Sequence, residues 1–240
     1  MTPADVRAAL VAAVRSAVEA GEIAVALADG DVPVNGRGAG VYGSPLALRL
    51  GVDAEVLARW LRDASGIERV TCRGGFLTIF VDSGRLAEDV LVEGDSYGVA
   101  RVPAGGWDEW PRTFENPGFA VRFAYARAAA VQRWADDLQV RPGPVLGARE
   151  DEELALLGVL AELPGRARQA ERERDAVPLV RCLERLAGAY HDVHERCPAL
   201  PRGDEKPGAV HAARVTLAEA ARIALGNGLN MIGETPRERI

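Results

Sequence analysis

The sequence predicts an α+β unit at the N-terminus followed by an all-α helical bundle. Residues 1–85 mix helical periodicity with runs of β-forming side chains. Residues 114–240 keep only the three-to-four-residue spacing of amphipathic helices. Between them, residues 92–113 carry glycines and prolines and hold no sustained period. We therefore expect an α+β domain over residues 1–85, a linker over 86–113 and a helical domain over 114–240.

Each element follows from a local pattern and its flanking residues. The first helix is expected to end at Gly21, Asp53 is a plausible N-cap, and Gly74-Gly75 is expected to turn a hairpin. In the first domain we expect a helix over residues 4–20, a strand over 22–29, irregular backbone over 32–45, two short helices of which the second covers 53–64, and a β-hairpin over 67–82. In the second domain we expect helices over residues 117–138, 149–162, 165–175, 177–196 and 208–225, with breaks at RPGP, LPG, CPALP and GNG.

The composition is that of a globular protein, with 48% hydrophobic and 27% charged residues. A net charge of −6 argues against general binding of phosphate backbones, although a local basic face stays compatible with it. Lys206 is the only lysine, so any chemistry that needs a lysine must use it. The start of the sequence shows no targeting leader, and no apolar run is long enough to span a bilayer. We therefore expect a cytoplasmic protein without a membrane partner.

The helix over residues 117–138 carries one unusual arginine. Its expected core stripe consists of Phe119, Phe123, Ala126, Ala130 and Trp134. Arg127 lies on the flank of this stripe, beside a gap left by the small Ala120. Such an arginine can pair with a carboxylate or extend to solvent, or it can bind a planar anionic ligand such as a nucleotide. Periodicity leaves both interpretations open.

Other motifs give no sign of catalysis. His191, His194 and Cys197 share part of a helical face, but no fourth ligand has convincing spacing, so we favour a core position for Cys197 over a metal site. The three cysteines are too scattered for a disulfide framework. The glycine-rich stretch 36–43 lacks the frame of a phosphate-binding loop. We expect no metal, no cofactor and no catalytic residue.

Several stretches resemble one family. ENPGFAVRFAYARA is similar to the helix that opens the anticodon-binding domain of arginyl-tRNA synthetases. Residues 183–200 and 213–240 resemble later helices and the closing segment of that domain. Residues 40–50 and 74–82 resemble the family's N-terminal domain, which contacts the elbow of tRNA. The resemblance implies that the helical bundle is anticodon-binding-domain-like.

The resemblance also implies a set of RNA contacts. It places Arg127 and Phe123 in the pocket for anticodon bases, which the last residue, Ile240, closes. Ala120 stands where the family has a second tyrosine, and Arg122 and Tyr125 stand where it has glutamine and histidine. The nucleic-acid-binding residues that it implies are Tyr42, Arg49, Ala120, Arg122, Phe123, Tyr125, Arg127 and Ile240.

The family's nucleotide-binding catalytic core should lie between the two matched parts, where this chain has only the expected linker. The core's H-I-G-H signature and lysine-bearing loop are both missing. The resemblance thus implies a non-catalytic paralogue that binds tRNA, with arginine tRNA as the expected ligand, and not DNA. One alternative is a protein-interaction module or auxiliary subunit that docks a synthetase or a biosynthetic enzyme. Another is a ligase component that works with a core supplied in trans.

Overall fold

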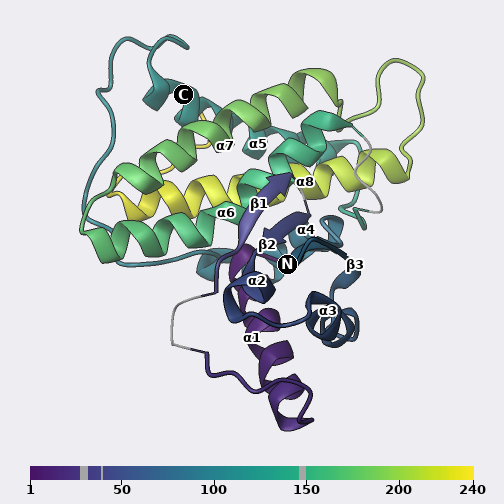
Figure 1. Ribbon diagram of the computed structural model, residues 1–240. Coiled ribbons are helices and arrows are strands. Elements are labelled where there is room, and N and C mark those ends of the chain that lie inside the picture. The colour runs from purple at the N-terminus through teal and green to yellow at the C-terminus, as the bar shows by residue number, and fades with distance from the viewer. Residues whose placement is uncertain (28–31, 39, 146–149) are drawn as a thin grey trace. The chain divides into compact units, whose positions relative to one another are not determined.

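The computed structural model describes residues 1–27, 32–38, 40–145 and 150–240. The chain divides into two compact units, residues 1–83 and 84–240 (Figure 1). The first unit combines helices with a four-stranded antiparallel sheet, and the described part of the second is helical. The predicted fold class, α+β followed by a helical bundle, is confirmed.

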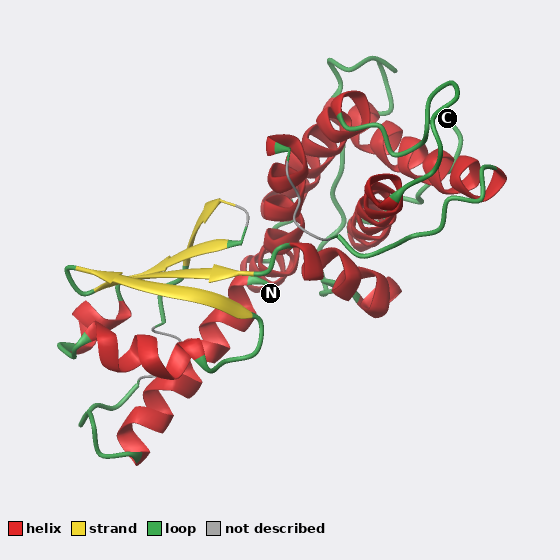
Figure 2. Cartoon of the chain, turned by 90° about the vertical axis from the view of Figure 1, so that its right-hand side faces the viewer, coloured by secondary structure: helices red, strands yellow, loops and turns green. Residues whose placement is uncertain are grey.

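The first unit packs its helices on one face of the sheet, as Figure 2 shows. Its strands lie in the order β1-β2-β4-β3, and every neighbouring pair is antiparallel. Leu10, Leu57 and Ile79 are fully buried in the core between the two layers. The elements are α1 (Pro3–Glu19), β1 (Asn35–Gly38), β2 (Val41–Ser44), α2 (Leu46–Leu50), α3 (Ala54–Arg62), β3 (Ile67–Arg73) and β4 (Phe76–Val81).

Local signals placed most of these elements correctly. The hairpin predicted over residues 67–82 is β3–β4, and the Asp53 side chain caps α3 by accepting from the Glu55 amide at 3.0 Å. The strand expected over residues 22–29 is wrong for the described residues 22–27, which form no ladder. Their alternate apolar side chains still pack against the core. The period of two therefore reflected burial on one side without strand pairing.

The stretch 32–45, expected to be irregular, contains the β1–β2 hairpin in its described part. Its glycines permit the pairing. A Cβ on Gly43 would lie 2.8 Å from the Phe76 ring of the neighbouring strand, and Gly40 has a φ of +66° with the Val81 carbonyl close by. High glycine content here marks close backbone approach rather than a loop.

The second unit begins earlier than expected. Part of the predicted linker over residues 86–113 is helical, because α4 packs its buried face against α6 and α8. Asn227 of α8 donates hydrogen bonds to the carbonyls of Gly94 and Tyr97, which fixes the end of this segment. The elements are α4 (Gly84–Glu93), the short 3-10 helix η1 (Gly94–Ser96), α5 (Pro117–Asp137), α6 (Asp151–Glu173), α7 (Val177–Arg196) and α8 (Ala209–Met231).

The break expected at LPG is wrong, because α6 continues through Pro164. Proline has no amide hydrogen, so it cannot donate to the carbonyl of Leu160 one turn earlier. The buried hydroxyl of Tyr97 donates to that carbonyl instead, at 2.8 Å. A contact distant in sequence thus replaces the hydrogen bond that proline removes.

Candidate nucleic-acid interface

Asn116 fixes the start of α5 and the loop before it. Its side-chain oxygen accepts from the Gly118 amide at 2.9 Å, and its amide group donates to the carbonyls of Asp108 and Pro111. Gly118 leaves room for Trp107, whose Cβ lies 2.4 Å from where a Cβ at 118 would stand. The loop that carries several aromatic and basic side chains is therefore ordered against the helix.

The face of α5 that enters the core is not the one expected. Phe119, Phe123 and Ala130 are half-buried, and Trp134 is 52% exposed; of the expected stripe only Ala126 is buried. The helix turns a different set of residues toward α7 and α8: Val121, Ala124, Tyr125, Ala128, Val131 and Ala135. The predicted core stripe is thus wrong, and its aromatic side chains line the surface.

Four rings form a cluster on this surface, which we call the ring cluster: Phe114, Phe119, Phe123 and His191. Phe119 and Phe123 stack with centroids 5.5 Å apart and planes 14° from parallel. Phe114 lies edge-on to both, and to His191 of α7 at 5.3 Å. Phe114 is exposed and the other three rings are half-buried, so the cluster offers π-faces at a surface.

Arg127 lies over the ring cluster and is held by α7. Its guanidinium carbon is 4.6 Å from the centroid of Phe123, within cation–π range. One nitrogen, Nη1, lies 3.1 Å from Nδ1 of His191 and 3.3 Å from a carboxylate oxygen of Glu195. The guanidinium is thus oriented before any ligand arrives.

The same hydrogen bonds define the tautomer and the protonation state of His191. Its Nε2 lies 2.9 Å from the carbonyl oxygen of Ala120, which can only accept, so Nε2 carries the proton and Nδ1 accepts from Arg127. Burial lowers the pKa of His191 below its ordinary value of 6.5, and the charge of Arg127 lowers it further. The neutral imidazole therefore serves as a fixed bridge between Ala120 and Arg127.

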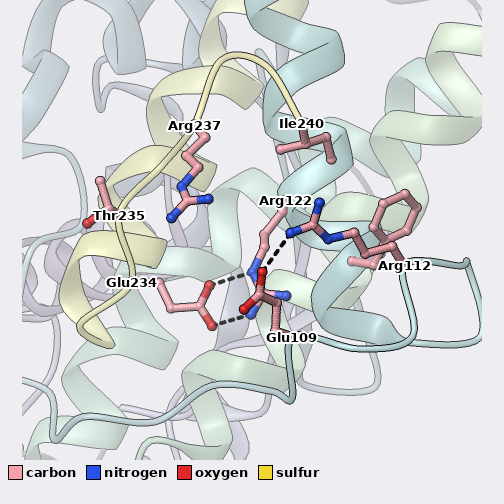
Figure 3. Close-up of a pocket in the computed structure, with 8 residues that line it drawn as sticks. Glu109, Arg112, Arg122, Glu234, Thr235, Arg237 and Ile240 are labelled. Carbon is pink, nitrogen blue, oxygen red and sulfur yellow. Dashed lines mark hydrogen bonds and ion pairs between the residues drawn. The ribbon is translucent and has the colours of Figure 1, made fainter.

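A pocket of about 260 Å³ opens beside Phe119, and Figure 3 shows its lining. Arg122 donates two hydrogen bonds of 2.8 Å to the carboxylate of Glu234, and Arg112 donates one of 2.7 Å to Glu109. The Arg112 hydrogen bond also lowers the pKa of Glu109. The lining residues are Glu109, Arg112, Phe119, Arg122, Glu234, Thr235, Arg237 and Ile240.

The structure brings five of the predicted contacts to this region of the second unit. Phe123 and Arg127 belong to the stacked surface, and Ala120 contributes its carbonyl oxygen rather than a gap. Ile240 lines the pocket as expected. Arg122 also lines it, but its guanidinium is already engaged by Glu234.

The other predicted contacts lie elsewhere. Tyr125 is only 8% exposed and packs against Gly226 of α8, so its ring belongs to the helix–helix contact. Tyr42 is 3% exposed in the core of the first unit, where its hydroxyl donates to the Met1 carbonyl at 3.1 Å. The burial of both rings argues against direct RNA contact, which stays a prediction for these two residues. Arg49 is exposed on α2 of the first unit.

Sequence reasoning missed five residues of the site: Arg112, Phe114, Phe119, His191 and Arg237. Two of them, Arg112 and Phe114, flank the expected end of the linker and carried no periodic signal. His191 was considered only as a metal ligand, whereas in the described residues no group of three or more His, Cys, Asp or Glu side chains could hold a metal ion. Nor does any helix within the described ranges have the length and apolarity to cross a membrane.

Comparison with known proteins connects this site to one family. The family of the DALR anticodon binding domain matches residues 121–240, which contain Phe123, Arg127, His191 and the residues after α8 that line the pocket. An arginine–tRNA ligase of Clavibacter sepedonicus is 32% identical over 211 residues, covering 79% of this chain and 36% of that protein. The chain thus spans about a third of the length of this curated relative.

A solved structure of Thermus thermophilus arginyl-tRNA synthetase is 23% identical; the match covers 53% of this chain and 22% of that chain, with a TM-score of 0.44. The family match covers half of the sequence, residues 121–240 of 240. The chain belongs to the family of the DALR anticodon binding domain.

Proposed function

We propose that the chain is a non-catalytic, cytoplasmic tRNA-binding protein that receives unstacked anticodon bases at the ring cluster and the adjoining pocket. The observation that carries the proposal is the oriented Arg127 over half-exposed rings, within the matched anticodon-binding domain. Single-stranded RNA is recognised where unstacked bases can stack on aromatic rings and guanidinium planes. The anticodon loop is the part of tRNA that offers such bases.

Although the chain carries a net charge of −6, the pocket holds one arginine that an anionic ligand can use. Arg112 and Arg122 are each neutralised by a carboxylate, so they contribute geometry more than charge. Among the residues that the structure describes, Arg237 makes no hydrogen bond or ion pair, and Figure 3 places its guanidinium at the pocket. Arg237 is therefore the cation we assign to a phosphate or base edge.

We further propose that the chain does not aminoacylate. Its single lysine, Lys206, lies exposed in the loop between α7 and α8, so no other lysine of this chain could serve in a lysine-bearing signature loop. Pyrophosphate exchange with ATP and arginine should therefore be undetectable for the chain alone. Stimulation of a complete arginine–tRNA ligase by the added chain would favour instead a component that works with a core in trans.

Fluorescence titration with purified tRNA tests the binding. We expect arginine tRNA, and an isolated stem-loop carrying its anticodon, to bind with a Kd below about 10 μM at low salt, where phosphate contacts are strongest. The same stem-loop with its loop bases replaced by abasic sites is the control, because it keeps the phosphates and loses the stacking. Absence of binding at low salt would refute the proposal, and equal binding of the abasic loop would refute the stacking site.

A second function is supported by a different pocket at the other end of α5. Exposed Trp134 and the half-buried Leu200 line a cavity of about 240 Å³ between α5, α7 and the loop before α8. An apolar cavity with an aromatic rim suits an anchoring side chain of a protein partner, such as a synthetase. A stoichiometric complex with an arginine–tRNA ligase, resistant to nuclease and lost in Trp134→Ala, would support this function.

A further inference from the structure

The last residues of the chain return along α5 and are held there by two arginines. We call residues 232–240, which follow α8, the tail. Arg122 holds Glu234 through two hydrogen bonds of 2.8 Å, and Arg133 holds Glu238 at 3.1 Å. The Gly105 amide also donates to the Ile232 carbonyl at 3.0 Å. The tail is thus attached at its start and at two points along its length.

The spacing of the two arginines explains how one helix can hold an extended segment. Arg122 and Arg133 are eleven positions apart, which is about three turns, so they lie on nearly the same face of α5 about 16 Å apart. Glu234 and Glu238 are four positions apart, a span of about 13 Å in extended chain. Side-chain length covers the difference, and the tail can run along the helix.

The Arg122–Glu234 pair is the better shielded of the two. Its side chains are 24% and 19% exposed, against 37% and 57% for Arg133 and Glu238. The Glu234 carboxylate packs against Gly106, where a Cβ would lie 2.7 Å from Oε1. The two bonds from Arg122 are parallel and charge-assisted, the arrangement that fixes geometry most strongly.

We propose that Arg122 and Glu234 are positioning residues that fasten the tail as one wall of the pocket, with Arg122 making no direct contact to the ligand. Glu234, Thr235, Arg237 and Ile240 reach the pocket only while the tail lies along α5 (Figure 3). This inference rests on the proposed tRNA-binding function for its effect on affinity. The attachment of the tail can be measured without RNA.

The test uses the full chain labelled with ¹⁵N and the variant Glu234→Gln, which keeps the size of the side chain and removes its charge. Backbone order parameters of the tail amides beyond residue 234 should fall from about 0.85 to below about 0.6, while those of α8 stay unchanged. Affinity for the anticodon stem-loop should fall about tenfold, the scale of one charge-assisted pair. The double variant Arg122→Glu with Glu234→Arg should restore both the tail order and the affinity.

The matched control is Glu219→Gln, which breaks the Arg222–Glu219 pair on α8, where the side chains are 29% and 19% exposed. It should leave the order of the tail unchanged. A rigid tail in Glu234→Gln would overturn the inference, as would a loosened tail with unchanged affinity for the stem-loop. If the wild-type chain binds no RNA, the proposed function fails, and the order parameters alone decide whether Arg122 and Glu234 fasten the tail.

Discussion

Arg127→Ala removes the guanidinium that connects α5, the ring cluster and α7. The variant loses a cation–π contact with Phe123, a hydrogen bond to the neutral His191, and an ion pair with Glu195, whose side chain is 63% exposed. These are worth about 0.5–1, 0.5–1.5 and 0.2–1 kcal/mol respectively. The three share one group and are not additive, so we expect a loss of about 1–2 kcal/mol in the free energy of unfolding.

The effect on RNA binding should be at least as large as the effect on stability. For a unit of this size, about 1–2 kcal/mol lowers Tm by roughly 2–8 °C. Loss of a stacking plane costs about 1–3 kcal/mol of binding, which is roughly a 5- to 150-fold rise in Kd. Folding free energy is measured by calorimetry, and Kd by fluorescence titration with the anticodon stem-loop at a temperature where the variant is fully folded.

Two further variants make the reasoning refutable. Arg222→Ala removes a part-buried arginine next to Tyr125, on the side of α5 turned away from Phe123. It should lower Tm similarly while the Kd changes less than twofold. Arg127→Lys keeps the charge without the planar fork, and should bind nearly as weakly as Arg127→Ala. Wild-type affinity in Arg127→Lys would refute stacking, and a Tm loss above about 10 °C in Arg127→Ala would make Arg127 a structural residue.

Three more predictions concern the fold and its titration. Tyr97→Phe should destabilise the second unit by about 1–3 kcal/mol, because the Leu160 carbonyl loses its donor. The cost should be smaller in a Pro164→Ala background, where the amide hydrogen at position 164 can donate to that carbonyl. Equal costs in the two backgrounds, measured by denaturant unfolding, would contradict this. Tyr42→Phe should lower the stability of the first unit by about 0.5–1.5 kcal/mol, because the hydrogen bond to Met1 is lost, and should leave the affinity for tRNA unchanged. A tenfold lower affinity would support the predicted RNA contact of Tyr42. Burial lowers the pKa of His191 and His194, so the unfolded chain binds more protons as pH falls through about 6.5, and Tm should drop between pH 7.5 and 5.5. In a variant with both histidines replaced by glutamine, the Tm measured by calorimetry should depend less on pH. An unchanged dependence of Tm on pH would contradict the assignment to His191 and His194.

The sequence predicted the order of the elements well because their signals are local. The turn at Gly74-Gly75 and the cap at Asp53 depend on residues within a few positions of each other. The prediction of which face of α5 enters the core was wrong, because that face depends on contacts with other helices. Alanines make several of its faces apolar, so the large side chains of Phe119 and Trp134 indicated the core, although the close contacts with α7 and α8 are made by small residues.

Burial of single residues depended on partners that a linear pattern does not reveal. Tyr42 stands among glycines, and only the pairing of β2 with β4 places its ring in the core. Pro164 ended a predicted helix because its missing hydrogen bond is local, whereas the compensating Tyr97 hydroxyl comes from a segment expected to be linker. In both cases the deciding contact joins residues far apart in sequence.

Contacts with residues far apart in sequence also distinguish the two arginines of the predicted site. Arg127 and Arg122 both lie on α5, and the resemblance implied RNA contact for both, with Arg127 as the family's own pocket arginine and Arg122 where the family has glutamine. Arg127 is held by a neutral histidine and an exposed carboxylate, which leaves its plane over the rings and its charge only partly satisfied. Arg122 donates two hydrogen bonds to a well-shielded carboxylate, so its charge is cancelled before any ligand arrives. If tRNA binds here, its affinity must therefore come more from stacking and from the shape of the tail than from neutralised phosphates, and an acidic chain can still be selective for RNA.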